Sequence, residues 1–155
     1  MNARKWERGQ SFVEASIGIV VLVIILGGLF DVGRAFLILT AVESATGEGA
    51  LYGASHPECL TTDYASSICQ ASMNQTVVSR VREEGKPVVT INEANVTVQI
   101  EGSGVITAGS VLRVDVTYRY SPVTPLGFML WGSTAEVRAS ARQQIMSPPP
   151  PGYRY

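Results

Sequence analysis

An uncharged apolar run near the N-terminus constrains this chain more than any other feature. Residues 15–30, ASIGIVVLVIILGGLF, carry no charged side chain, and apolar character reaches back to Phe12 past one acid, Glu14. The middle of the run is apolar at nearly every helical angle, which is typical of a helix in lipid or deep inside a protein. A membrane crossing needs about 20 such residues. We therefore expect residues 12–30 to form one transmembrane helix.

Basic side chains precede this run and predict its orientation. Arg4, Lys5 and Arg8 stand against one acid, Glu7. The positive-inside bias then predicts a single-pass protein of the cytoplasmic membrane, with its N-terminus in the cytoplasm and the rest of the chain outside. The competing interpretation is a cleaved secretory signal peptide, which needs a small-x-small cleavage site after a short apolar core. Gly27-Gly28 matches such a site only loosely, and the apolar pattern continues beyond it.

Helical patterns continue beyond the apolar run. Alanine-rich sequence predicts one continuous helix from about residue 11 to 54, ended by His56-Pro57 because the residue before a proline is pushed out of the α region. A second helix is predicted over 62–84, where apolar residues recur at three- and four-residue steps. Thr62 is its candidate N-cap, and Gly85-Lys86-Pro87 ends it.

The pattern then switches to an alternation of apolar and polar residues. Three such runs, at 96–101, 112–120 and 135–142, predict an antiparallel sheet of about three strands with one apolar face. The second helix and the outer half of the first helix are expected to cover that face, which makes the fold class α+β. The chain is thus expected to divide into a polar segment 1–9, a transmembrane and spine helix 10–54, an extracytoplasmic α+β domain 55–146 and a flexible Pro-rich tail 147–155.

Composition and motifs argue against several classes of function. The net charge of −1 does not favour nucleic acid as a partner. The sequence contains no G-x-S-x-G motif and no phosphate-cradling glycine loop. His56 is the one histidine and abuts a proline in a predicted loop. We therefore expect neither an enzyme nor a cofactor.

The two cysteines, Cys59 and Cys69, both follow the apolar run. With a single histidine nearby they make a poor metal site, because structural zinc needs four ligands. A local disulfide is the simpler interpretation and requires an oxidising compartment. Two free buried thiols are the alternative.

Glu14 is the most informative polar residue. An acid at mid-span costs ~2.5–3.5 kcal/mol on insertion scales, so it is a functional candidate. If the chain is cut after Gly9, Gln10 gains a positive amine one helical turn before Glu14, and the amine of one subunit can meet the carboxylate of a neighbour. Alternatively, Glu14 lies at the headgroup interface of an uncut signal anchor. Its spacing alone leaves both interpretations open.

Asp31 and Arg34 follow the apolar run at helical spacing. They can pair along the helix, either as a contact with a partner helix or as a snorkelling pair that marks the outer interface, and we favour the second interpretation. Gly27-Gly28, with Gly33, can let another helix approach closely.

The predicted connection between the last two strands is unusually apolar. Residues 125–131 read PLGFMLW, and the bulky residues Phe128, Met129, Leu130 and Trp131 end it. The loop is either a satellite core or a site that touches the membrane or a neighbouring subunit.

The N-terminal segment RGQSFVEASIGIVVLVIILGGLFDVGRAFLILTAVESATGEGALYGAS resembles the TadE/TadG-like family of pseudopilins from tight-adherence (Flp-type) pilus loci. The resemblance rests on Arg8-Gly9-Gln10, Val13-Glu14-Ala15, Asp31-x-Gly33-Arg34-Ala35-Phe36 and Glu48-Gly49-Ala50. The stretch VDVTYRYSPVTPLGFMLWGSTAEVRASARQQ also looks like that family's C-terminal half. The resemblance implies a pilin-like fold, a prepilin-type leader over residues 1–9, cleavage by a prepilin peptidase after Gly9, and Glu14 as the acid of the processing motif.

Departures from the family pattern narrow the implied role. Ala15 follows Glu14 where major Flp pilins carry an aromatic residue, Gly47 stands where family members often carry Arg, and this chain has about one hundred residues of outer domain. Ala15 and the size of the domain favour a minor pseudopilin in assembly, initiation or membrane anchoring of an adhesive pilus, whereas Gly47 argues against an ion pair at that helical turn. The implied partners are the prepilin peptidase, other pilin or pseudopilin subunits, the membrane assembly platform and the lipid bilayer. The alternative is a signal-anchored binding module that is neither processed nor part of a pilus.

Overall fold

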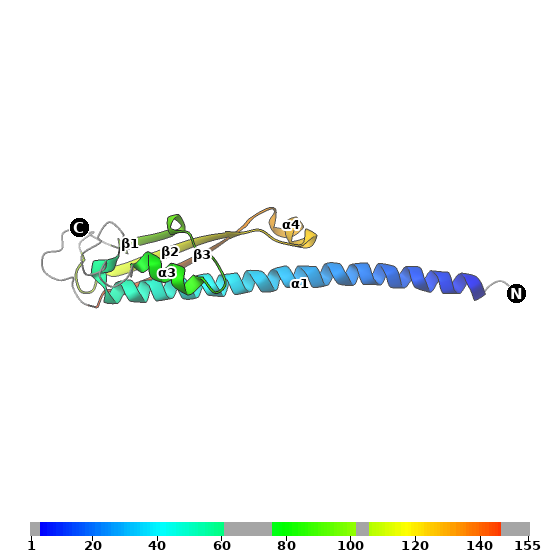
Figure 1. Ribbon diagram of the computed structural model, residues 1–155, viewed down its shortest axis with the longest axis horizontal. Helices are drawn as coiled ribbons and strands as arrows, with labels where there is room; N and C mark the ends of the chain where they lie inside the picture. Colours follow the sequence, from blue (N-terminus) through cyan, green and yellow to red (C-terminus); the bar gives the residue numbers. More distant parts are fainter. Residues whose placement is uncertain (1–3, 61–75, 102–105, 147–155) are drawn as a thin grey trace. The chain divides into compact units, whose positions relative to one another are not determined.

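A computed structural model describes residues 4–60, 76–101 and 106–146, with side chains from Gln10 onward (Figure 1). The chain forms two compact units. The first comprises Met1–Ala35 and Ser121–Ala135, and the second comprises Phe36–Tyr120 and Glu136–Tyr155. The predicted tail 147–155 lies outside the described residues.

The first helix, α1 (Arg4–Ser55), is a single α-helix that contributes to both units (Figure 1). Its length and its end before His56 confirm the predicted long helix, and a short 3-10 helix, η1 (Pro57–Cys59), follows it. Its start differs from the prediction near residue 11, because the preceding arginine, lysine and glutamate side chains are themselves good helix formers. By length and composition α1 can cross a membrane.

In the second unit, one stripe of α1 is buried. Its members recur at three- and four-residue steps, as expected for the face of a helix that packs on a core: Ile38, Val42, Ala45, Thr46, Gly49, Ala50 and Gly53. Two glycines let neighbours approach this stripe closely. A Cβ at Gly49 would clash with the Val81 side chain, and one at Gly53 would lie 2.5 Å from Leu112 Cδ2.

The second helix of this unit is α3 (Val77–Gly85). Thr76 begins it with a capping box: its hydroxyl accepts a hydrogen bond from Ser79 N–H at 3.2 Å, while Ser79 Oγ accepts one from Thr76 N–H at 2.8 Å. Thr76 is extended, with φ −89° and ψ 161°. The prediction of one continuous helix over 62–84 is therefore wrong at Thr76, because this cap competes with helix continuation. Thr62 lies outside the described residues.

The three predicted strands are confirmed within two residues of their expected bounds: β1 (Val96–Glu101), β2 (Val111–Tyr120) and β3 (Ala135–Gln144). A short 3-10 helix, η3 (Glu93–Asn95), precedes β1. The strands form an antiparallel sheet in the order β1-β2-β3, as predicted. Alternate residues of β2 face the core, and these are Leu112, Val114 and Val116. The α+β class is thus confirmed.

The first unit contains a helix where a loop is predicted. Residues 125–131 form α4 (Pro125–Trp131), which corrects the expected apolar loop. Local signals explain the helix. Thr124 is an extended N-cap whose hydroxyl accepts a hydrogen bond from Gly127 N–H, Pro125 has the fixed φ that suits a first helical position, and Gly132 ends the helix with φ 76°.

Candidate functional site

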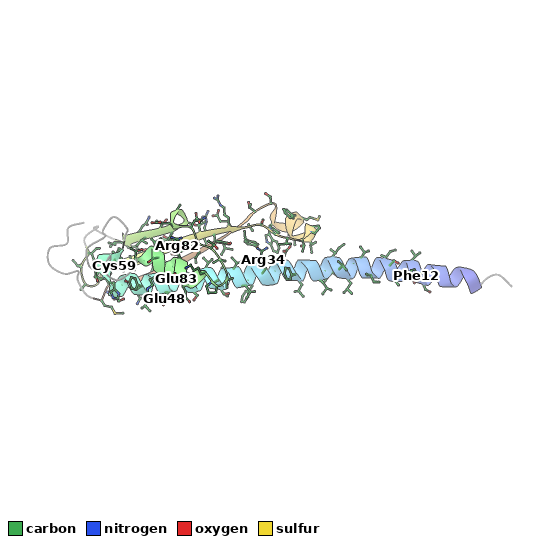
Figure 2. The ribbon with its side chains drawn as sticks, viewed as in Figure 1. Phe12, Arg34, Glu48, Cys59, Arg82 and Glu83 are labelled. Atoms are coloured by element: carbon green, nitrogen blue, oxygen red, sulfur yellow. The ribbon has the colours of Figure 1, made fainter. Side chains whose placement is uncertain are left out.

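The apolar part of α1 exposes its side chains all round within the first unit. Phe12 and Phe30 mark its ends, and the bulky residues between them are each about half exposed or more. Figure 2 shows side chains projecting from both sides of α1 along its length from Phe12 toward Arg34. The stretch rises about 28 Å at 1.5 Å per residue, close to the ~30 Å thickness of the hydrocarbon core. One N-terminal helix that can span a membrane is thus present.

Glu14 is the one acid within this apolar stretch, and its side chain is exposed. Its carboxylate makes no hydrogen bond or ion pair with any group of residues 10–60, 76–101 or 106–146. Gln10 is also exposed and lies one helical turn before it, while Gly9 lies within α1. The structure therefore places Gln10 and Glu14 on the same face, and cleavage between Gly9 and Gln10 remains a prediction.

Asp31, at the other end of the apolar stretch, is only 2% exposed. Val123 N–H donates to Oδ1 at 3.1 Å, and Thr124 N–H donates to Oδ2 at 3.0 Å. The Thr124 hydroxyl donates to the same Oδ2. Three donors thus converge on one carboxylate within the first unit.

Arg34, labelled in Figure 2, is exposed, and its nitrogens do not lie within 4 Å of the Asp31 carboxylate oxygens. The ion pairs within 4 Å that involve described residues all lie in the second unit. The predicted helix pair is therefore replaced by contacts between Asp31 and the segment that leads into α4. The physical reason is that two backbone N–H groups and a hydroxyl are close enough to satisfy the carboxylate directly.

Small residues bring α4 close to α1. A Cβ at Gly28 would clash with the Leu126 side chain, and a Cβ at Gly127 would clash with the Asp31 carboxylate and lie 2.7 Å from Pro122 Cβ. The close approach expected at Gly27-Gly28 is therefore made by a helix of the same chain. Beside this contact is an apolar hollow lined by Val23, Ile24, Gly27, Thr124, Pro125, Leu126 and Met129.

The four bulky residues of α4 named from the sequence are exposed. Met129 is 85% exposed, Leu130 64%, Phe128 47% and Trp131 40%. Side chains this exposed do not form a satellite core among the described residues, so the other expectation, a contact surface, is the one that remains.

The chain matches no protein-family model, no curated protein and no solved structure. The resemblance to pseudopilins therefore remains a prediction.

Cys59 and His56 lie just beyond the end of α1 in the second unit. Cys59 is buried, while Cys69 lies outside the described residues, so their pairing remains a prediction. The His56 ring stacks on Tyr52 at 4.6 Å between centroids, and its Nδ1 lies 2.9 Å from Ser55 Oγ. That hydroxyl also donates to the Tyr52 carbonyl at 2.9 Å. These contacts hold the end of α1 together.

The exposed side of the sheet carries ion pairs that sequence reasoning missed. Glu136 on β3 accepts a hydrogen bond from Arg119 Nε at 2.9 Å and another from Arg138 Nε. Both bonds lower the pKa of the Glu136 carboxyl, and the bond from Arg119 has the larger effect. The alternation of arginines and acids in the last two strands is the sequence signal for these ion pairs. Which arginine meets Glu136 depends on how β2 and β3 are aligned in the sheet, and the sequence does not give that alignment. No cluster of three potential metal ligands occurs among the described residues.

Proposed function

We propose that this chain is a minor pseudopilin-like protein that acts in the assembly, initiation or membrane anchoring of an Flp/Tad-type adhesive pilus. The observation that carries the proposal is the environment of Glu14. This exposed acid lies on a long apolar helix, has no partner among the described residues, and stands one turn after Gln10. The resemblance of the N-terminal segment to TadE/TadG-like pseudopilins supports the same role.

The charges explain how such a helix would join others. A carboxylate within the hydrocarbon region is expensive unless it meets a partner. Cleavage after Gly9 would create a positive amine on Gln10, at the N-terminus of a helix whose own macrodipole already disfavours positive charge. A neighbouring subunit's Glu14 would stabilise that amine, and the amine would neutralise the carboxylate. Each charge therefore favours side-by-side packing of two copies or of two related subunits.

The proposal also assigns partners and a location. The prepilin peptidase would process the chain in the cytoplasmic membrane, and pilin or pseudopilin subunits and the assembly platform would bind its apolar helix within the bilayer. The α+β domain would lie outside the cytoplasm, where a disulfide between Cys59 and Cys69 can form. The size of this domain supports a minor subunit over the bulk filament subunit.

Processing is tested at the mature N-terminus. The full chain is expressed in a strain with active prepilin peptidase, purified from membranes, and examined by N-terminal sequencing and intact mass. We expect the sequence to begin at Gln10. Retention of Met1 would reject processing and favour the alternative, a signal-anchored binding module.

The pairing role is tested by Glu14→Gln, with Glu43→Gln as the matched control. Both residues are exposed on α1, but only Glu14 lies in the apolar stretch. We expect Glu14→Gln to insert normally in the membrane and to lose pilus assembly, while Glu43→Gln retains both. Normal assembly by Glu14→Gln would reject the pairing. A tagged chain located in sheared filaments or in membranes then separates a filament subunit from a membrane anchor.

A further inference from the structure

Helix α4 lies beside the apolar stretch of α1 and not beyond its end. Thr124, at the start of α4, is the neighbour that a Cβ at Gly27 would meet at 3.3 Å, and the apolar hollow includes Val23. Val23 precedes Asp31 by eight residues, which is about 12 Å of helix. If Asp31 marks the outer end of the hydrocarbon region, α4 therefore lies at the depth of the outer leaflet.

The surface of α4 matches that depth. None of its seven residues, PLGFMLW, is charged, and the indole N–H of Trp131 is the one polar side-chain group. Met129 and Leu130 are more than 60% exposed. Their apolar surface is continuous with the exposed apolar surface of α1 through the hollow that Met129 shares with Val23 and Ile24. A helix so apolar would be costly to leave in water.

We propose that residues 121–131, with α4 at their centre, enter the outer leaflet of the bilayer that α1 spans. The chain would then contact the membrane at two points, through α1 and through a short helix folded against it. The partner is lipid and not protein, because α4 continues the lipid-facing surface of a membrane helix and offers no charged group for recognition. The proposal depends on the apolar span and not on cleavage at Gly9 or on a pilus, so it stands or falls separately from the pseudopilin role.

The Asp31 contacts supply part of what such an insertion requires. Irregular backbone at membrane depth is tolerated only where its polar groups are satisfied within the protein. Here the N–H groups of Val123 and Thr124 donate to Asp31, Gly127 N–H donates to the Thr124 hydroxyl, and Phe128 N–H donates to the Thr124 carbonyl at 3.0 Å. The turn that enters α4 is thus closed by hydrogen bonds, which also accounts for a nearly buried acid at this end of the span.

Tryptophan fluorescence tests the proposal in the full chain. The protein has two tryptophans, so Trp6→Phe leaves Trp131 as the sole emitter. The variant is reconstituted in phosphatidylcholine vesicles, with and without brominated acyl chains. We expect short-wavelength emission that brominated lipid quenches and aqueous iodide does not. Quenching by iodide alone would place Trp131 in water and overturn the proposal. Quenching by neither agent would place it against protein, such as a second copy, and would also overturn it.

A matched control moves the tryptophan to the second unit. Val88 is a 53% exposed apolar residue there, more exposed than Trp131 itself. The triple variant Trp6→Phe, Val88→Trp, Trp131→Phe is expected to show the reverse pattern, with strong quenching by iodide and little by brominated lipid. Equal quenching by brominated lipid at both positions would mean that no specific insertion of α4 occurs, and would overturn the proposal.

Discussion

Gly53 offers the sharpest test of how the second unit packs on its part of α1. An ideal Cβ at this position would lie 2.5 Å from Leu112 Cδ2, 2.8 Å from Val77 Cγ2 and 3.1 Å from Leu60 Cδ2. These atoms belong to β2, to α3 and to the segment after η1, so one added methyl group would press on three parts of the core. Gly47, six residues earlier on the same helix, has nothing within 4 Å of its added Cβ.

The expected magnitudes follow from two opposing effects. Replacing a helical glycine with alanine favours the helix by about 0.8–1.0 kcal/mol. Overpacking a well-filled core costs about 1–3 kcal/mol. Gly47→Ala has only the first effect and should stabilise the domain by up to about 1 kcal/mol. Gly53→Ala has both, so its free energy of unfolding should lie about 1–3 kcal/mol below that of Gly47→Ala.

The assay compares the two variants as full chains in detergent micelles. Unfolding of the second unit is followed by near-ultraviolet circular dichroism and by limited proteolysis during heating. At about 4–8 °C per kcal/mol for a domain of this size, the two melting temperatures should differ by at least about 4 °C. Equal melting temperatures would refute the reasoning, because they would mean that the three side chains around Gly53 can move aside without a loss of stability.

Three further variants test other contacts. Thr76→Ala removes the N-cap of α3 and should lower the free energy of unfolding by about 1 kcal/mol in a denaturant titration; an unchanged midpoint would contradict the capping role. Asp31→Asn should speed hydrogen exchange at the amides of residues 123–124, whereas the control Arg34→Gln should not; equal rates in both variants would reject the assigned acceptor. Glu136 has a lowered pKa, so its contribution to stability is present above its unfolded pKa of about 4.3 and is lost as pH falls through the folded value. Glu136→Gln should therefore flatten the acid limb of the stability curve, and an identical limb in both proteins would refute the contribution.

The elements that sequence predicts well here are those with a sustained period. The strands β1 and β2 alternate apolar and polar residues over their length, and in the sheet Val96 faces Val116 and Ile100 faces Leu112. The long helix α1 was equally readable, because its apolar run leaves no other structure that satisfies the backbone in lipid. In each case the signal is local and repeated, so one ambiguous residue does not change the prediction.

Short elements were harder because single residues decide them. The apolar period of α3 extends back through Thr76, yet the reciprocal bonds between Thr76 and Ser79 begin a new helix there. Thr124-Pro125 and Gly132 are the start and stop signals of α4, but they flank an apolar run that is equally typical of a contact loop. Start and stop chemistry thus outweighs periodicity in pieces shorter than about three turns.

The acids near the two ends of the apolar stretch of α1, Glu14 and Asp31, show where sequence spacing fails and what the structure adds. Asp31 has a basic residue three positions later, so helical spacing favours Arg34 as its partner. Its hydrogen-bond donors are instead Val123 and Thr124, which follow it in the sequence by 92 and 93 positions. Glu14 has no partner among the described residues. The acid at one end of the span is therefore satisfied by its own chain, while the acid at the other end is not. Because an unpaired carboxylate is costly in a bilayer, this difference is the strongest physical reason to seek the partner of Glu14 at a newly formed N-terminus on another subunit.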